Sequence, residues 1–415
     1  MKFIDIAKQA KEASLKLANL STEVKNNALE MVANALDLNR KKLIEANEKD
    51  LLSAKKMVEA GELSEAVYNR LKLDDNKLNA MISGVRDLVK LDDPINKCLL
   101  ARELDEGLNL YKISCPIGVI GIVFEARPDV ITQISSLAIK SANAVILKGG
   151  KEAENTNRVS YEIITEALDC VEGFPKNVIN QVYSREDVAK MLDMKDYISL
   201  IIPRGGNSLV QFVQNNTKIP VLGHADGICH IFVDETADLK MAADIIIDAK
   251  TQYPSACNAV ETVLIHEKFK DSEALLTAIK NADIKVIDKP ECWNFEYSDK
   301  ILSHKFVKNL DEAISHINTY GSGHTDSIVT DNISNAERFM NEVDSAGVYH
   351  NASTRFSDGY RYGFGAEVGI STNKTHARGP VGLDGLTIYK YKLYGSGQTV
   401  KPYADGQKKF THKSL

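Results

Sequence analysis

Short apolar runs separated by helical stretches constrain the fold of this chain more than any other feature. One series comprises residues 119–124, 144–147, 178–183 and 197–202, and a second comprises residues 231–233, 262–265, 284–287, 327–329 and 347–349. Apolar runs that alternate with helices predict βαβ units and a mostly parallel, buried sheet. We therefore expect an α/β protein with two such units, divided near residues 223–227.

The length of 415 residues also predicts at least two domains, because one hydrophobic core rarely serves so long a chain. Residues 1 to about 95 have a helical pattern, with Ser21 or Thr22 as a candidate N-cap. One helical stripe there is apolar, and we expect it to be buried; it comprises Val24, Ala28, Met31, Ala35 and Leu38.

Charge and cysteine usage exclude several classes of function. A formal net charge of -6 leaves no excess of Lys and Arg to displace counterions, which argues against a nucleic-acid or membrane-surface binder. The six cysteines form no Cys-x-x-Cys pair, so we expect no metal site, no disulfide framework and a reducing cytoplasm. No apolar stretch is long enough for a membrane span, and we expect neither signal peptide nor anchor.

Cys257 lies in a turn of small residues that leads directly into an apolar run. A thiol presented at such a turn can act as a nucleophile and hold an acyl group. The alternative is a buried cysteine that serves only as a small hydrophobic side chain. No histidine lies near Cys257 in the sequence, so we expect backbone amides, a nearby cation or a cofactor to activate the thiol.

Two predicted strand ends carry glycines that could hold the phosphates of a dinucleotide. The first consists of Lys148, Gly149, Gly150 and Lys151, and the second contains Gly205 and Gly206 before a helical stretch. The Gly-x-Gly-x-x-Gly fingerprint is absent. A plain strand-to-helix turn and a solvated lysine therefore remain as alternatives.

Several segments resemble the aldehyde dehydrogenase superfamily in their order and spacing. They are residues 115–121 (Cys-Pro-Ile-Gly-Val-Ile-Gly), residues 141–148 (Ser-Ala-Asn-Ala-Val-Ile-Leu-Lys), the Cys257 turn and residues 310–321. Residues 123–129 (Val-Phe-Glu-Ala-Arg-Pro-Asp) and 363–372, continuing to 376–383, resemble one family within it, the gamma-glutamyl phosphate reductases. The resemblance implies an aldehyde dehydrogenase-like α/β fold with a Rossmann-type cofactor domain, an α/β catalytic domain and a small strand-like oligomerisation element.

The resemblance also implies domain limits. The implied NADP-binding domain comprises residues 1–99 and 116–224, completed by about 367–385; the catalytic domain with Cys257 comprises 225–366, and the oligomerisation strands comprise 100–115 and 386–402. Independently, the strand-like residues 386–394 could pair with residues 108–113 and extend a sheet to a neighbouring subunit.

Individual residues match the superfamily's functional positions. Cys257 matches the catalytic thiol, and Lys148 matches the lysine that contacts the adenosine ribose. Lys151 stands where many members have a glutamate that disfavours a 2'-phosphate, and a cation there favours NADPH over NADH. Glu296 aligns with the glutamate that holds the nicotinamide ribose.

Two departures from the superfamily favour a reductase. The general-base glutamate of hydrolytic members is missing, because the corresponding segment begins with His224. Reduction of an acyl phosphate through a Cys257 thioester requires no activated water, so this absence fits a reductase. The side-chain oxyanion asparagine is missing too, which leaves the backbone amides of Cys257 and Asn258, with help from Arg127, to stabilise the oxyanion.

The implied reaction is the NADPH-dependent reduction of L-glutamate 5-phosphate to L-glutamate 5-semialdehyde and phosphate, the second step of proline biosynthesis. This substrate needs cations for two anionic groups. The candidates are Arg127, His224, Arg361, Lys374, His376 and Arg378. Surface ion pairs are the alternative fate of such residues, and Arg355 and Arg361 could simply pair with Asp358.

Two other functions stay open from the sequence. An oxidising aldehyde dehydrogenase would keep the fold and release its acyl group to water or another acceptor, without any acceleration by phosphate. A non-catalytic dinucleotide-binding protein would bind NADPH without thiol chemistry. We also expect a homo-oligomer, and association with a glutamate kinase is a further possibility because acyl phosphates are labile.

Overall fold

The computed structural model describes residues 2–223 and 226–415, which form two compact units. The first unit comprises Met1–Gly205, Val213–Val221 and Gly382–Leu415, and the second comprises Gly206–Phe212 and Leu222–Val381. No helix in the described part of the chain combines the length and apolarity needed to cross a membrane.

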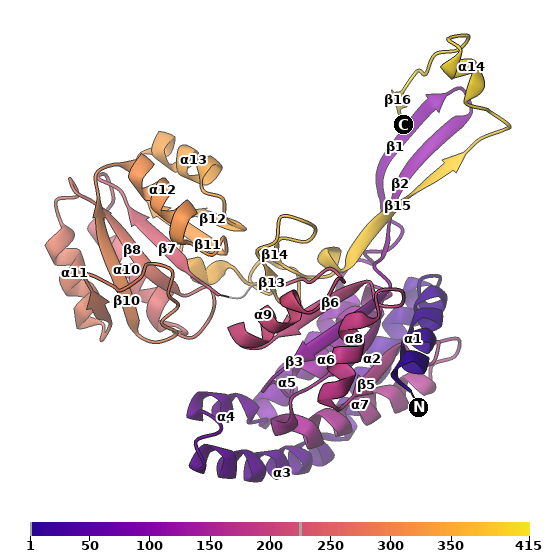
Figure 1. Cartoon of the computed structure of the whole chain (residues 1–415), viewed down its shortest axis with the longest axis horizontal. Helices are drawn as coiled ribbons and strands as arrows, with labels where there is room; N and C mark the ends of the chain where they lie inside the picture. Colours follow the sequence, from indigo (N-terminus) through magenta and orange to yellow (C-terminus); the bar gives the residue numbers. More distant parts are fainter. Residues whose placement is uncertain (1, 224–225) are drawn as a thin grey trace. The chain divides into compact units, whose positions relative to one another are not determined.

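The first unit begins with five helices, as its amino-terminal pattern predicts (Figure 1). They are α1 (Phe3–Leu17), α2 (Thr22–Leu38), α3 (Arg40–Glu59), α4 (Glu65–Leu71) and α5 (Asp75–Lys90). Ser21 is the N-cap of α2, because its side chain accepts a hydrogen bond from the Val24 N–H.

The expected buried stripe of α2 is partly wrong. Leu38 is 86% exposed, and the buried apolar side chains are Ala28, Leu29, Val32, Ala33 and Leu36. The helix packs against both α5 and α7 (Glu154–Asp169), so its buried face is broader than one stripe and centred about one residue further along the chain.

Four parallel strands form the sheet of this unit, in the order β5-β4-β3-β6. Their bounds are β3 (Val119–Phe124), β4 (Ala144–Lys148), β5 (Ile179–Val182) and β6 (Leu200–Arg204). The four predicted strands are thus confirmed, although β6 begins three residues later than expected. The strand order reverses at β3, and ligands of such sheets bind beyond the carboxyl ends of the strands at this point.

Helices α6 (Val130–Lys140), α7 and α8 (Arg185–Asp193) connect these strands. Strand β3 is buried along its whole length, as expected for a strand with both faces covered.

A six-stranded parallel sheet forms the core of the second unit, in the order β12-β11-β7-β8-β10-β9. Its strands are β7 (Cys229–Val233), β8 (Val260–His266), β9 (Lys285–Ile287), β10 (Ile301–Val307), β11 (Thr325–Val329) and β12 (Gly347–His350). Five of them match predicted runs. Strand β10 was not predicted, because Ser303, His304 and Lys305 interrupt its apolar pattern although the first two are buried.

Helices cover both faces of this sheet (Figure 1). They are α10 (Leu239–Thr251) and α11 (Ser272–Asn281) on one face, and α12 (Leu310–Tyr320) and α13 (Ile333–Glu342) on the other. Alternate side chains of β7 enter the two cores: Ile231 and Val233 pack with α10 and α11, whereas Phe232 packs with α12 and α13.

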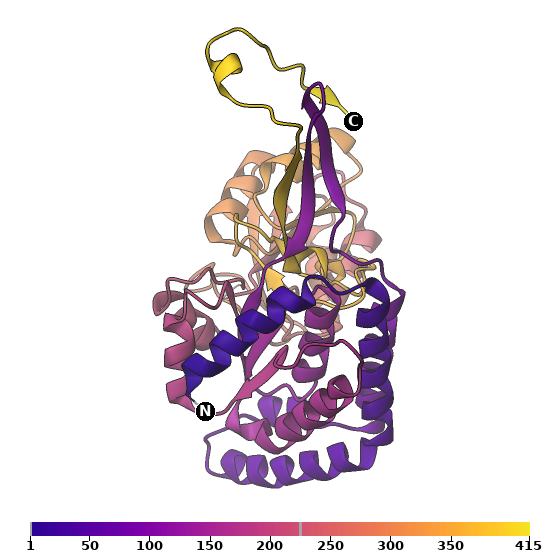
Figure 2. The same cartoon turned by 90° about the vertical axis from the view of Figure 1, so that its right-hand side faces the viewer.

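An antiparallel arm projects from the rest of the first unit (Figures 1 and 2). Its strands are ordered β15-β2-β1-β16, with bounds β1 (Cys98–Asp105), β2 (Leu108–Pro116), β15 (Thr387–Tyr394) and β16 (Lys413–Ser414). Tyr391 lies opposite Lys112, and the Lys112 Nζ lies 3.7 Å from the centre of the Tyr389 ring. The predicted pairing of residues 386–394 with residues 108–113 is confirmed.

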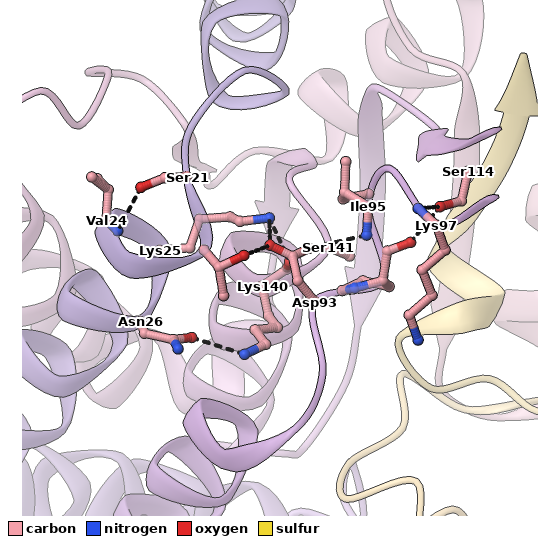
Figure 3. Close-up of polar contacts among 12 residues, drawn as sticks. Ser21, Val24, Lys25, Asn26, Asp93, Ile95, Lys97, Ser114, Lys140 and Ser141 are labelled. Atoms are coloured by element: carbon pink, nitrogen blue, oxygen red, sulfur yellow. Dashed lines mark hydrogen bonds and ion pairs between the residues drawn. The ribbon is translucent and has the colours of Figure 1, made fainter.

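A cluster of buried charges lies where the arm joins the helices (Figure 3). We call Thr22, Lys25, Asn26, Asp93 and Lys140 the lysine cluster. The Lys25 Nζ lies 2.5 Å from an Asp93 carboxylate oxygen, and the Lys140 Nζ donates to Asn26 Oδ1 at 2.8 Å. Burial opposes ionisation of Asp93, but hydrogen bonds from Lys25 and Thr22 outweigh it and lower the pKa of Asp93. Lys25 therefore has a carboxylate partner, whereas Lys140 has only neutral acceptors, and burial lowers the pKa of Lys140 although Asp93 opposes the change.

Candidate active site

Cys257 lies on a double turn between α10 and β8. The Ala256 N–H donates to the Tyr253 carbonyl at 3.1 Å, and the Ala259 N–H donates to the Ala256 carbonyl at 2.8 Å. The thiol is partly exposed. Among the described residues, none accepts a hydrogen bond from the Cys257 or Asn258 N–H. These two amides can therefore donate to an oxygen atom that develops negative charge beside the thiol.

His324 is the histidine that sequence reasoning missed. It directly precedes β11, is fully buried, and places its Nε2 3.2 Å from the Cys257 Sγ. Its Nδ1 lies 2.9 Å from the Thr325 hydroxyl. An imidazole in this position can exchange a proton with the thiol.

Strand order explains this contact. β11, β7 and β8 are neighbours in the sheet, and His324 and Cys257 both lie before the first residues of their strands. The site is therefore at the edge formed by the amino ends of these strands. The only feature of the sequence that could have pointed to His324 is its place just before an apolar run.

A second thiol, that of Cys229 at the start of β7, lies close to the first. The Cys229 Sγ is 3.4 Å from the Cys257 carbonyl oxygen and 3.8 Å from the His324 Nδ1. Complete burial, followed by the nearby charge of Asp326, raises the pKa of Cys229 well above its ordinary value. Cys229 therefore stays protonated, and Cys257 is the candidate nucleophile.

Close packing fixes the backbone around Cys257. A Cβ added to Gly227 would lie 2.1 Å from the Cys257 carbonyl oxygen, so no larger residue fits there without displacing the turn. The Gly227 N–H donates to Glu296 Oε2 at 3.0 Å. Glu296 thus lies beside the turn as a partly buried hydrogen-bond acceptor.

The candidate substrate cations differ in their surroundings. Arg378 is exposed and forms an ion pair with Asp344 at 3.1 Å. The exposed Arg361 donates from Nη1 to the Arg355 carbonyl. Arg127 is exposed in the first unit, and His224 lies outside the described residues.

The alternative pairing of Arg355 or Arg361 with Asp358 is wrong. An Asp358 carboxylate oxygen accepts the backbone N–H groups of Tyr360 and Arg361, at 3.0 and 3.2 Å. In the described chain, neither arginine side chain lies within ion-pair distance of a carboxylate.

The glycines after β4 line a pocket in the first unit. The lining residues are Gly149, Gly150, Lys151, Glu154, Asn157, Gln181, Val182 and Tyr183. A Cβ on Gly149 would lie 2.3 Å from the Asn157 Nδ2, so the close approach requires glycine. The Asn157 amide is buried, and neither its nitrogen nor its oxygen has a partner among the described residues. This amide and the exposed Lys151 can contact a polar ligand, and the charge of Lys151 favours an anionic one.

The other candidate cofactor residues lie at the ends of neighbouring strands. Lys148 is the last residue of β4, and burial lowers its pKa although Glu152 and Glu125 oppose the change. Gly205 and Gly206 lie between β6 and α9 (Asn207–Asn215), where the chain passes from the first unit to the second. A Cβ on Gly206 would meet no atom within 4 Å. Packing within the described protein therefore does not require a glycine at Gly206.

Comparison with known proteins supplies the family. The model of the aldehyde dehydrogenase family matches residues 2–292 and 284–367. The gamma-glutamyl phosphate reductase of Brachyspira hyodysenteriae is 57% identical, with 100% of each chain covered. That of Methanococcoides burtonii is 50% identical, covering 98% of this chain and 96% of the relative.

Solved structures agree. The crystal structure of gamma-glutamyl phosphate reductase from Thermotoga maritima is 41% identical with a TM-score of 0.92, covering 96% of this chain and 100% of the other. An acetylating aldehyde dehydrogenase from Geobacillus thermoglucosidasius is only 16% identical with a TM-score of 0.68, over 96% and 97% of the two chains, and shares the fold alone. This chain therefore belongs to the gamma-glutamyl phosphate reductase family, within the aldehyde dehydrogenase family.

Proposed function

We propose that this protein reduces L-glutamate 5-phosphate to L-glutamate 5-semialdehyde and phosphate, with NADPH as the reductant and Cys257 as the nucleophile. The reaction is the second step of proline biosynthesis. The observation that carries the proposal is the 3.2 Å contact between the Cys257 Sγ and the His324 Nε2, on a turn whose two amides are free to donate. Family membership supports the substrate.

In the first chemical step, His324 accepts the thiol proton and the Cys257 thiolate attacks the acyl carbon of the substrate. The bond between that carbon and the phosphate oxygen breaks, and a thioester forms on Cys257. The departing phosphate takes the proton from His324. Bound NADPH supplies hydride. The Cys257 and Asn258 amides donate to the acyl oxygen in each addition, and loss of the aldehyde restores the thiolate.

The same site explains why water need not compete. Hydrolysis of the thioester would require a base beside the acyl carbon. The buried carboxylate on β8, Glu261, is instead held by the Lys250 Nζ at 2.8 Å, and both side chains are completely buried. Desolvation raises the pKa of Glu261 to about 7. A pKa near 7 would suit a general base, but Glu261 is completely buried and so has no contact with solvent water.

Cofactor selection follows from the pocket after β4. The ammonium group of Lys151 would attract the 2'-phosphate of NADPH, while Gly149 and Gly150 allow the backbone to approach the ligand. Lys148 would contact the adenosine ribose, Gly205 and Gly206 would face the pyrophosphate, and Glu296 would hold the nicotinamide ribose.

We also propose that the arm joins two or more copies of this chain. Strand β15 is an edge strand, paired only with β2 in the described chain. It and its neighbours expose apolar side chains, namely Leu99, Tyr391, Leu393 and Tyr394. Apolar side chains on an unprotected edge are typical of a subunit contact. Light scattering on Leu393→Asp tests this, since a smaller assembly is expected; an unchanged mass would contradict it.

Phosphate dependence tests the proposed reaction in reverse. NADP+ reduction by L-glutamate 5-semialdehyde is measured with and without phosphate, for the wild type and Cys257→Ala. Activity that requires both phosphate and Cys257 supports acyl-phosphate chemistry. Cys170→Ala, which removes an exposed thiol in the first unit, is the matched control and should retain full activity. Phosphate-independent turnover would assign the protein to the oxidising enzymes, and cofactor binding without turnover would indicate a non-catalytic protein.

A further inference from the structure

Arg355 is a buried cation without a carboxylate partner in the described chain. It lies in the short helix η2 (Thr354–Phe356) and is only 8% exposed. Its Nε donates to the neutral Gln252 Oε1 at 2.9 Å, and its guanidinium lies 5.9 Å from the centre of the Tyr253 ring. These contacts orient the guanidinium without neutralising its charge.

Two buried hydrogen bonds tie η2 to the nucleophile turn. The Thr354 hydroxyl donates to the Asn258 carbonyl at 2.7 Å, and the Asn258 Nδ2 donates to the Ser357 carbonyl at 2.8 Å. Arg355 therefore lies between two residues anchored to the neighbour of Cys257. Its contacts with Gln252 and Tyr253 join it to the other side of the same turn. All these residues belong to the second unit.

Burial of this cation is costly. Desolvation, and next the nearby charge of Arg361, lower the pKa of Arg355, whereas Cys257, Asp358 and Asp248 only partly oppose this. The Arg361 side chain donates to the Arg355 carbonyl and so adds a second cation nearby. A buried charge normally has a partner of opposite sign, because an unpaired one is strongly destabilising. An anion bound from outside the fold would supply such a partner for Arg355.

We propose that Arg355 binds an oxyanion of the substrate beside Cys257. The inference rests on the proposed reaction, whose substrate has two suitable groups, the phosphoryl group on the reacting carbon and the α-carboxylate. A planar guanidinium held by Gln252 and Tyr253 can donate its remaining N–H groups to either in a bidentate manner. Arg355 is thus a specificity-determining residue, for which the sequence alone offered only an ion pair with Asp358 as an alternative.

A test independent of turnover uses alkylation of Cys257. Iodoacetate is an anion and iodoacetamide is neutral, so the ratio of their rates with Cys257 measures attraction of anions to the thiol. Arg355→Gln is expected to lower this ratio about tenfold or more, and Arg355→Lys should recover part of the loss. A second measurement uses the wild type and so does not depend on the folding of a variant. Inorganic phosphate or L-glutamate should compete with iodoacetate for Arg355 and slow its reaction with Cys257. Arg338→Gln, an exposed arginine of α13, is the charge-matched control.

Kinetics of NADP+ reduction distinguish the two anions. If Arg355 binds the phosphoryl group, Arg355→Gln raises the KM for phosphate at least about tenfold and leaves the KM for the semialdehyde unchanged. If it binds the α-carboxylate, the KM for the semialdehyde rises instead, and discrimination against an uncharged aldehyde is lost. The two proposals can fail separately. If Arg355→Gln lowers the alkylation ratio but the wild type shows no phosphate-dependent turnover, the reductase function is refuted while the anion site is supported. An unchanged ratio, with no protection of the wild type, would overturn the proposal.

Discussion

The lysine cluster and the Cys257 site both bury cations, but only the lysine cluster contains a carboxylate that pairs with one of them. In the first unit, Lys25 pairs with Asp93, and Lys140 donates to Asn26 and to the Val89 carbonyl. In the second unit, Arg355 contacts an amide, a ring and no carboxylate among the described residues. The Lys25–Asp93 ion pair maintains the fold. Unlike the amine of Lys140, whose pKa burial lowers, the guanidinium of Arg355 cannot lose its proton, so its charge is available to a ligand.

The largest effect should come from removing the nucleophile. Cys257→Ala is expected to reduce phosphate-dependent NADP+ reduction by at least about 10⁴-fold without loss of stability, since the thiol is partly exposed. Cys229→Ala is the matched substitution of the adjacent, buried thiol. Steady-state kinetics per folded molecule should show near-normal activity for Cys229→Ala. If Cys229→Ala lost activity and Cys257→Ala kept it, Cys229 would be the nucleophile instead of Cys257.

Removal of the imidazole should have the next largest effect. His324→Gln is expected to lower turnover about 10³-fold, because the thiol loses its proton acceptor. The remaining activity should rise with pH, since hydroxide from solution can then deprotonate the thiol. Iodoacetamide alkylation of Cys257 as a function of pH measures this step alone. Equal alkylation rates in wild type and variant would show that His324 does not act on the thiol.

The lysine cluster should affect stability but not chemistry. Asp93→Asn leaves Lys25 buried without its counter-ion, which costs about 3 kcal/mol in the free energy of unfolding at neutral pH. The pKa of Asp93 is lowered in the folded protein, so its contribution is present above the unfolded value and is lost as pH falls through the folded value. The difference between variant and wild type should therefore shrink below about pH 4.

Denaturant unfolding at several pH values measures this difference. Asp244→Asn, which removes an exposed partner of Lys240, should change stability little. Activity per folded molecule should be unchanged in Asp93→Asn. If Asp93→Asn lost catalysis at unchanged stability, the lysine cluster would not differ from the Cys257 site in the way described here.

The smallest expected effect concerns cofactor choice. Lys151→Glu should raise the KM for NADPH about tenfold relative to that for NADH, because an exposed charge contributes modestly. Lys195→Glu, an exposed lysine of the same unit, is the control for net charge. Kinetics with both cofactors test this, and an unchanged preference in Lys151→Glu would remove Lys151 from the cofactor site.

The sequence predicted those parts of the fold whose signal is local. Runs of apolar residues predicted β3 and β7 because both are buried on two faces. Strand β10 escaped prediction because its buried Ser303 and His304 are polar. The buried face of α2 depends on which helices it packs against, which a single helical stripe does not specify.

For the site, too, the sequence predicted only what depends on neighbouring residues. The turn of small residues around Cys257 and the glycines after β4 are both visible as short motifs. His324 is 67 residues from Cys257 in the sequence, and their contact depends on the strand order β11-β7-β8. The role of Arg355 depends on hydrogen bonds from Thr354 and Asn258 that join distant segments. From the sequence alone, pairing of Arg355 with Asp358 stayed open as an alternative, because the two residues are close in the chain.

A rapid-mixing experiment without phosphate tests most directly whether Cys257 holds the acyl group. The protein is mixed with L-glutamate 5-semialdehyde and NADP+, NADPH is followed by absorbance, and Cys257 is examined by peptide mass spectrometry. We expect a burst of one NADPH per Cys257 and an acyl adduct on that residue, followed by turnover only when phosphate is added. Sustained NADPH formation without phosphate, or a burst without an adduct on Cys257, would contradict this expectation.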